Sequence, residues 1–498
     1  LGVTSATEVV VFALACMALN ILVGYTGLTS FGHGAWFGLA AYAVGMSQKA
    51  FAPGSFVVPA LIGIGVVLAA SLVFGFLILR RRGVYFSLLT LALSAMLYSV
   101  AFRWTEVTGG ENGLGGITRP VLAGVSFESA AYYYALVASI AFGAIVALWR
   151  FHRSPLGSVL VAIRENEQRA RFIGYPTNRV KLTAFVASAT LTGLAVMLLA
   201  FNTLMSSAEP ISVAFSGELL AMVIIGGMRS FLGPALGALF FVIFRDSLSR
   251  VTEHWLLIFG ILFVAFIVFS PTGLVGLYER ATARWRKAVV GEAAMAQRLA
   301  GTVALPEFLK PARIADTIIL EAVLEAKGLA KHFGGIQAVK DMRLRLRDRT
   351  LHALIGPNGA GKTTAFNLIS GLYAPDRGSV TLAGQALQGQ APEQVTQAGI
   401  GRSFQITNLF TSLSVAENVR LAVQARHPKR FALWADAQSL HEVNRDAAEV
   451  VRTMGLGGVE AASAASLSYG GQRLLDMALA LATRPRVLLL DEPLAGLA

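Results

Sequence analysis

Long apolar segments fill the first 275 residues of the chain, and none of comparable length follows them. The apolar core of a membrane is about 30 Å thick, so a helix that crosses it needs roughly 20 mostly apolar residues. The pattern therefore predicts a polytopic α-helical membrane domain at residues 1–280. The clearest predicted spans are 8–26, 55–79, 84–102, 131–149, 181–201, 231–248 and 255–271.

Two further apolar stretches, 33–50 and 214–228, are short or interrupted by glycine. Each is compatible with a crossing, a re-entrant segment or the wall of a cavity buried in protein, and we expect about eight to ten crossings in total. His33 lies in the first stretch. Because an ionisable group at membrane depth needs a partner or a cavity, His33 has either a packing or a functional role, and we favour packing.

The distribution of Lys and Arg predicts the orientation, since short loops rich in these residues stay in the cytoplasm. Residues 80–82, residues 150–181 and the segment that begins at Arg280 are such regions. The loop 106–130 carries three Glu and one Arg, so it is predicted to face outside. Three spans before residue 80 would place the N-terminus outside. Because residue 1 is Leu, either a starting segment precedes it or residues 33–50 do not cross.

Beyond residue 321 the pattern changes to alternating short strands and helices, which predicts an α/β domain at 321–498 with a predominantly parallel sheet. Residues 281–320 are predicted to be a linker. Composition agrees with two domains, because 55% hydrophobic residues with 14% charged residues are too apolar for one soluble protein. The net charge of +13 is explained by the basic membrane ends, so no nucleic acid partner is expected. The single Cys16 excludes an internal disulfide.

A phosphate-binding loop is predicted where the strand LHALIG at 351–356 runs into GPNGAGKTT at 356–364. Glycines let backbone N–H groups approach phosphates, and the N-terminus of the following helix favours negative charge. The lysine of this pattern reaches the β- and γ-phosphates, and the next hydroxyl ligates magnesium. The predicted nucleotide contacts are Gly356, Asn358, Gly359, Gly361, Lys362, Thr363 and Thr364.

An acidic pair follows the apolar run of RVLLLDEP at 486–493. Such a strand delivers Asp491 to its carboxyl end, where the carboxylate can hold the magnesium shell. Glu492 is then placed to polarise the attacking water. We therefore predict ATP and Mg²⁺ as cofactors, with Thr363 and Asp491 at the metal and Glu492 as the catalytic base.

These motifs together resemble the nucleotide-binding domain of ABC transporters over residues 322–498. Gln405 in RSFQITNLF is similar to the family's Q-loop residue, which implies contact with magnesium, the attacking water and the membrane domain. Phe333 matches the aromatic residue that stacks on adenine. The resemblance also implies that the D-loop starts at 495–498 and that the family's switch histidine would fall beyond residue 498.

LSYGGQ at 467–472 is similar to the signature motif of the same family, with Tyr469 in place of the commoner glycine. The resemblance implies that this motif closes on the γ-phosphate held by an opposite ATPase domain. The residues concerned are Ser468, Gly470, Gly471 and Gln472.

The first half is similar to the permeases of branched-chain amino acid ABC importers over nearly all of residues 10–278. The blocks that carry the resemblance are ALNILVGYTGLTSFGHGAWFGLAAYAVG, RRGVYFSLLTLALSAML, TGGENGLGGI, SPLGSVLVAIRENEQRARFIGYPTNRVKLTAFVASATLTGLA and VIIGGMRSFLGPALGA. The resemblance implies that the loop 150–181 holds a coupling helix that docks near Gln405. Arg164, Glu165 and Glu167 are the candidate coupling residues.

The resemblance implies a bacterial inner-membrane importer with a cytoplasmic ATPase, in which permease and ATPase are fused. Its expected partners are a second permease, a second ATPase, a periplasmic substrate-binding protein, membrane lipid and a small amino acid. Urea, short amides or small aromatic acids are the alternative cargo. A regulatory ABC assembly that moves no solute is a rival of another class. The number of predicted spans argues against a soluble ATPase with a simple anchor.

Replacing Glu492 with Gln in the complete protein is expected to leave ATP binding intact and to abolish turnover, because the amide cannot act as a base. Nucleotide binding and steady-state hydrolysis measure the two effects separately. Undiminished hydrolysis would refute the role of Glu492.

Overall fold

The structure is a computed structural model that describes residues 2–81, 83–122, 124–283, 305–309, 322–405 and 407–492. The chain divides into two compact units, one formed by Leu1–Arg153 with Asn178–Ala288 and the other by Ser154–Thr177 with Val289–Ala498. The predicted coupling segment therefore groups with the second unit. Arg82, most of the linker predicted at 281–320 and the D-loop predicted at 495–498 lie outside the described residues.

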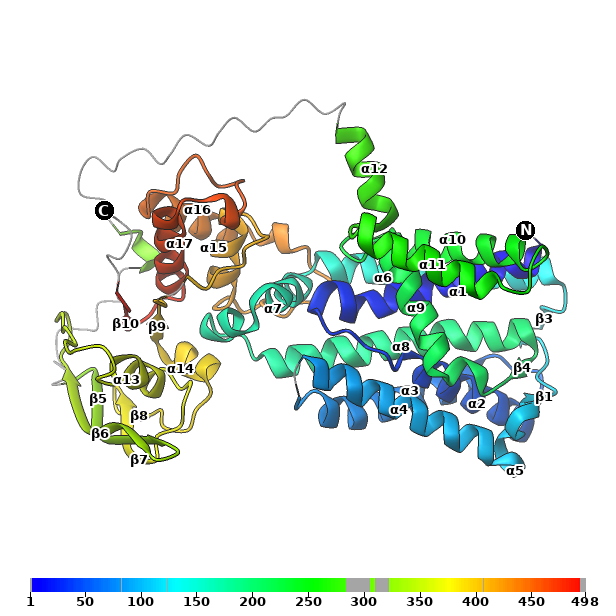
Figure 1. Ribbon diagram of the computed structural model, residues 1–498, viewed down its shortest axis with the longest axis horizontal. Coiled ribbons are helices and arrows are strands. Elements are labelled where there is room, and N and C mark those ends of the chain that lie inside the picture. The colour runs from blue at the N-terminus through cyan, green and yellow to red at the C-terminus, as the bar shows by residue number, and fades with distance from the viewer. Residues whose placement is uncertain are drawn as a thin grey trace. The chain divides into compact units, whose positions relative to one another are not determined.

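Helices dominate the first unit (Figure 1). Within the described residues, five of its helical segments are long and apolar enough to cross a membrane, or six if α11 and α12, bent by 48°, form one span. The long segments are α1 (Val3–Asn20) with its π-helical continuation η1 (Ile21–Thr26), α3 (Val57–Ile78), α4 (Val84–Arg103), α6 (Ala130–Arg153) and α8 (Thr177–Thr203).

This count is below the expected eight to ten because the remaining apolar helices are short or contain polar residues. The stretches 33–50 and 214–228 each form one helix, α2 (His33–Ala50) and α9 (Val213–Gly226). The C-terminal turns of α2 contain Gln48 and Lys49, and α9 has only 14 residues. The others are α10 (Gly233–Leu248), which has 16 residues, α11 (Trp255–Phe269) and α12 (Gly273–Ala283).

Burial separates central helices from peripheral ones in this unit. The most apolar windows of the α1 and α8 segments are 78% and 67% buried, whereas those of α3, α4 and α6 are 28% buried. The helix α1 packs against α6, α9 and α10. The exposed sides of α3, α4 and α6 carry large apolar residues such as Leu61, Phe76 and Phe142, as expected for surfaces that face lipid.

His33 joins three of these helices. Its imidazole is fully buried at the start of α2, and Nε2 lies 3.0 Å from the Ser188 hydroxyl on α8. That hydroxyl in turn donates a hydrogen bond to the Ala18 carbonyl of α1 at 2.6 Å. A buried polar group with such partners ties helices together, which agrees with the packing interpretation.

Short elements connect the helices of the first unit. The glycine-rich block after α4 folds back so that β1 pairs antiparallel with β4, with Leu114 opposite Ser206. These elements are α5 (Thr105–Thr108), η2 (Gly110–Asn112), β1 (Leu114–Gly115), β2 (Val121–Leu122), β3 (Val125–Ser126), β4 (Met205–Ser206) and η3 (Glu209–Ile211).

A four-stranded antiparallel sheet, ordered β6-β5-β7-β8, is the larger sheet of the second unit. The other sheet pairs β9 with β10 in parallel, with Val487 opposite Ile400. The prediction of a predominantly parallel sheet is therefore wrong for the described residues. The strands are β5 (Leu324–Phe333), β6 (Ile336–Leu346), β7 (Arg377–Leu382), β8 (Gln385–Ala386), β9 (Ile400–Arg402) and β10 (Val487–Leu489).

The strand predicted at 351–356 is also wrong. These residues form no strand, and Leu351 and Ile355 are 98% and 89% exposed. A strand needs a neighbour that pairs with its N–H and C=O groups. None of the strands in the described part of the chain pairs with this stretch.

One hydrophobic core connects the two sheets of the second unit. It contains Leu324 and Val380 from the antiparallel sheet, Leu368 from α13, and Ile400 and Leu489 from the parallel pair. Three further helices, α15, α16 and α17, pack together beside it (Figure 1). The helices are α7 (Pro155–Phe172), α13 (Lys362–Ile369), α14 (Pro392–Ala398), α15 (Val415–Gln424), α16 (His441–Thr453) and α17 (Tyr469–Ala482); the short 3-10 turns are η4 (Glu307–Leu309), η5 (Ala437–Ser439) and η6 (Ala464–Ser466).

Close packing of α9 and α10 depends on glycine. A Cβ atom added to Gly237 would lie 1.9 Å from the Met222 carbonyl oxygen, and one added to Gly226 would lie 1.9 Å from the Gly233 carbonyl oxygen. Small residues of this kind let helix backbones approach each other in membranes.

We expect Gly237→Ala to separate α9 from α10 and to lower the thermal midpoint of the detergent-solubilised protein. The matched control is Gly260→Ala in α11, where an added Cβ has no atom within 4 Å. The two variants can be compared by thermal unfolding and by size-exclusion chromatography. Equal midpoints for both variants would contradict the close-packing account.

Candidate functional site

The predicted phosphate-binding loop runs directly into α13. Gly359 and Gly361 have φ angles of 86° and 88°, in the left-handed region that glycine adopts without strain. A Cβ atom on Gly361 would lie 2.3 Å from the Ala338 carbonyl oxygen. The Lys362 ammonium donates to the carbonyls of Gly356 and Pro357 at 2.5 and 2.9 Å, so the lysine closes over the loop.

The first turn of α13 presents polar side chains. Thr363 is exposed and Thr364 is half-buried, while Asn358 in the loop is exposed. Together with the lysine and the backbone N–H groups at the helix start, they form a surface suited to phosphate.

The acidic pair follows β10, as predicted. Burial raises the pKa of the Asp491 carboxyl, and the charges of Arg402, Arg473 and Lys362 oppose that shift. The Lys362 charge acts on the Asp491 carboxyl, as expected if the loop and the acidic pair lie near each other. Glu492 is exposed and has a φ of 49°, a left-handed conformation that is uncommon outside glycine and recurs at functional sites.

The donor set fits magnesium. No group of three or more His, Cys, Asp or Glu side chains that could hold a metal occurs among the described residues. Magnesium in nucleotide sites needs no such cage, because phosphates and water fill most of its positions. The exposed Thr363 hydroxyl, the Asp491 carboxylate and the exposed Gln405 amide supply ligands of the oxygen type that Mg²⁺ prefers.

Phe333 ends β5 and is 43% exposed. Its ring packs edge-on against Tyr373, with centroids 5.3 Å apart, and the Lys331 ammonium lies 5.8 Å from its centroid. An exposed aromatic face of this kind can stack on a base.

The LSYGGQ motif forms the N-terminus of α17. The Ser468 hydroxyl caps the helix by accepting a hydrogen bond from the Gly471 N–H at 3.2 Å. Gly470, Gly471 and Gln472 are half-buried, and Ser468 and Tyr469 are exposed. The Gln472 side chain accepts from the Thr407 hydroxyl at 3.4 Å, which connects the motif to the segment after Gln405.

Residues 2–267 match the family described as branched-chain amino acid transport system / permease component. The chain belongs to this permease family. Residues 339–495 match the ABC transporter ATPase family, so the permease is joined to an ABC ATPase that binds nucleotide and hydrolyses ATP.

The two halves of the chain have separate relatives. The ATPase is 39% identical over 181 residues to the high-affinity branched-chain amino acid transport ATP-binding protein BraF of Pseudomonas aeruginosa, covering 35% of this chain and 71% of that protein. The permease is 29% identical over 297 residues to the permease protein LivM of Salmonella typhimurium, covering 55% of this chain and 70% of that protein. The ATP-binding protein LivG of Escherichia coli is 37% identical over 182 residues, covering 36% of this chain and 71% of that protein.

The segment 154–177 of the permease sequence lies on the ATPase in the second unit. Its helix α7 is capped by Ser154, whose hydroxyl accepts from the Gly157 N–H at 3.1 Å. The helix predicted around residues 162–167 is present, but it is kinked at Asn166 (φ −157°, ψ 95°). The Asn166 side chain accepts from the Arg169 N–H at 2.9 Å and so starts a second short helix.

Of the three predicted coupling residues, Glu165 contacts the ATPase directly. Its carboxylate accepts from the Ser412 backbone N–H at 3.2 Å and pairs with Arg164 at 2.9 Å. Burial opposes ionisation of Glu165, but these hydrogen bonds outweigh it and lower its pKa. The Glu167 carboxylate accepts from the Thr177 hydroxyl at 3.1 Å, a hydrogen bond within the segment 154–177.

The end of the segment, which sequence reasoning did not single out, also contacts the ATPase. The Thr396 hydroxyl donates to the Phe172 carbonyl at 3.0 Å, and the Phe172 ring packs edge-on against Phe404, one residue before Gln405, with centroids 4.9 Å apart. The buried Tyr175 hydroxyl donates to the Leu421 carbonyl of α15 at 2.9 Å. Ring contacts and hydrogen bonds to distant backbone carbonyls leave no signal in the sequence beyond an aromatic residue in a basic loop.

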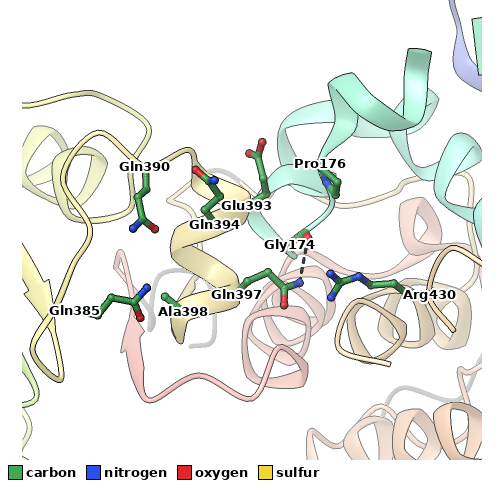
Figure 2. Close-up of a pocket in the computed structure, with 9 residues that line it drawn as sticks. All are labelled: Gly174, Pro176, Gln385, Gln390, Glu393, Gln394, Gln397, Ala398 and Arg430. Atoms are coloured by element: carbon green, nitrogen blue, oxygen red, sulfur yellow. Dashed lines mark hydrogen bonds between the residues drawn. The ribbon is translucent and has the colours of Figure 1, made fainter. Parts of the chain in front are cut away.

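Gly174 sits tightly against α14, as Figure 2 shows. The Gln397 amide donates to the Gly174 carbonyl at 3.1 Å, and a Cβ atom on Gly174 would lie 2.5 Å from that amide nitrogen. An open pocket of about 560 Å³ lies beside this contact, and its remaining lining residues are Pro176, Gln385, Gln390, Glu393, Gln394, Ala398 and Arg430. None of the residues of the phosphate loop or the acidic pair lines it, so the pocket is separate from the nucleotide site.

We expect Glu165→Ala to lower uptake several-fold while ATP hydrolysis continues, because the change removes the acceptor for the Ser412 N–H and loosens the docking of α7. Ser158→Ala is the matched control, since the Ser158 hydroxyl bonds only within α7, to the Ser154 carbonyl at 3.3 Å. Parallel measurement of uptake and hydrolysis in vesicles checks the expectation. Unaffected uptake would count against the coupling assignment.

Proposed function

We propose that this chain is a fused permease and ATPase subunit of an importer for branched-chain amino acids. The observation that carries the proposal is that both halves of one chain are similar to proteins named for this transport system. The two matches to relatives are independent of each other, because the permease and the ATPase have unrelated folds and separate relatives. The docking of 154–177 on the ATPase supports mechanical coupling of the two halves.

The proposed ATP site uses the predicted residues in their predicted roles. Gly356, Asn358, Gly359, Gly361, Lys362 and Thr364 would contact the phosphates, and Phe333 would stack on adenine. Thr363, Asp491 and Gln405 would hold Mg²⁺, which when bound neutralises charge on the β- and γ-phosphates. Glu492 would take the proton of the attacking water.

The proposed cycle needs two ATPase domains. The exposed N-terminus of α17, with Ser468, Gly470, Gly471 and Gln472, would close on the γ-phosphate of a second ATPase subunit. Closure would move Gln405 together with the ATPase surface that α7 contacts, because Phe172 packs on Phe404. A second permease would complete the pathway across the bacterial inner membrane. A periplasmic binding protein would deliver the solute to its outer face.

Urea, short amides and small aromatic acids remain the alternative cargo, and they share the same machinery. Uptake by the assembled complex distinguishes them. We expect leucine, isoleucine and valine to compete with one another for binding-protein-dependent uptake, with urea and benzoate having no effect. Uptake of urea or benzoate in preference to leucine would overturn the assignment of cargo.

A further inference from the structure

An ion pair in the interior of the second unit connects the docking segment to α17. The Arg169 guanidinium lies 3.1 Å from the Asp476 carboxylate, and both side chains are 0% exposed. The same guanidinium donates to the Asp476 carbonyl at 2.9 Å and to the Arg402 carbonyl of β9 at 3.3 Å. The pair thus joins α7, α17 and the strand that precedes Gln405.

Asp476 and its neighbour on α17 reach the catalytic strand end. The second Asp476 oxygen accepts from the Phe404 N–H at 3.0 Å. Arg473, one helical turn earlier and also 0% exposed, donates to the carbonyls of Phe404, Asp491 and Glu492, the last at 2.6 Å. Arg473 therefore holds the backbone of the candidate magnesium ligand Asp491 and of the candidate base Glu492.

These contacts form one continuous network. It contains the side chains of Arg169, Asp476 and Arg473 and the backbone of Phe404, Asp491 and Glu492. Burial raises the pKa of Asp476, and the adjacent Arg169 charge opposes that shift. A charge this deep in a protein is stable only beside close partners. Removing one partner leaves the other charge buried and uncompensated, which destabilises the fold. Arg169 is therefore the residue through which α7 contacts α17, and Arg473 of α17 in turn contacts the strand end.

A second pair on the same segment serves as an internal comparison. Arg171 pairs with Glu393 of α14 at 3.0 Å, but these side chains are 22% and 18% exposed. Glu393 lines the open pocket of Figure 2 rather than the nucleotide site. This pair fastens the segment to the surface of the ATPase and has no described contact with Asp491 or Glu492.

We propose that Arg169 is a positioning residue for ATP hydrolysis, through which the docking segment of the permease sets the place of Asp491 and Glu492. The inference rests on the proposed function for the identity of the machine and goes beyond it in assigning the path of coupling. It also assigns Arg473 as the residue that holds the catalytic strand end to α17, the helix whose N-terminus carries the LSYGGQ motif.

The test compares variants of the full chain in its assembled complex by steady-state hydrolysis of Mg-ATP. Arg169→Lys keeps the charge but loses the forked donor geometry. The expected result is a fall in kcat of roughly 2- to 30-fold, the range typical of residues on a coupling path, with KM for ATP unchanged within about twofold. Arg171→Gln, the matched control, is expected to keep kcat.

A double variant, Arg169→Met with Asp476→Asn, covers the case in which the single variant does not fold, since neither residue of the pair is then left as a lone charge. Arg473, which lies 4.0 Å from Asp476, keeps its backbone carbonyl acceptors in this variant. It is expected to assemble and to show the same fall in kcat. Normal kcat in either variant, or an equal fall in Arg171→Gln, overturns the proposal. Because hydrolysis is measured without any solute, a complex that hydrolyses ATP but imports no branched-chain amino acid would refute the proposed cargo and leave this test intact.

Discussion

The buried ion pair of Arg169 and Asp476 holds residues 154–177 against the rest of the second unit. Each charge costs several kcal/mol to remove from water, and only a close partner with further hydrogen bonds offsets that cost. Arg169 also donates to the Asp476 and Arg402 carbonyls, and Asp476 also accepts from the Phe404 N–H, although Arg169 Nε and Asp476 Oδ1 make no hydrogen bond within the described residues. Phe172, Gly174 and Tyr175 then fill the surface around the pair. A segment that precedes the ATPase by about 150 residues of sequence thereby becomes part of its structure.

The first unit meets a different constraint, because lipid offers no hydrogen bonds. Its central helices are therefore tied by polar contacts such as His33 with Ser188, and by glycine contacts such as Gly237 with Met222. The outer faces of α3, α4 and α6 stay apolar. The ATPase thus contains a buried ionic network, whereas the permease relies on close backbone contact.

Features that depend on local chemistry could be predicted from the sequence. The long spans follow from continuous apolar runs, and the loop around Lys362 follows from glycine spacing. The acidic pair follows from an apolar strand that ends in two carboxylates. The strand at 351–356 was predicted wrongly because a strand depends on a partner that its own residues do not reveal. The kink at Asn166 depends on a side chain that caps a new helix, which a mixed-charge pattern does not distinguish from a continuous helix.

The contacts made by Arg169 could not be predicted, because its partner is 307 positions away and both residues are ordinary members of amphipathic helices. Of the predicted coupling residues, Glu165 reaches the ATPase, while Glu167 braces the segment. The roles of the predicted nucleotide residues stay predictions.

The central claim is that hydrolysis by this ATPase drives import through the permease in the same chain. Its most direct test is simultaneous measurement of ATP hydrolysed and leucine accumulated by the complete complex in sealed vesicles, with an external binding protein. We expect leucine-loaded binding protein to raise hydrolysis and leucine to accumulate in proportion to the ATP consumed. Hydrolysis that is indifferent to the loaded binding protein, with no accumulation of leucine, would contradict it.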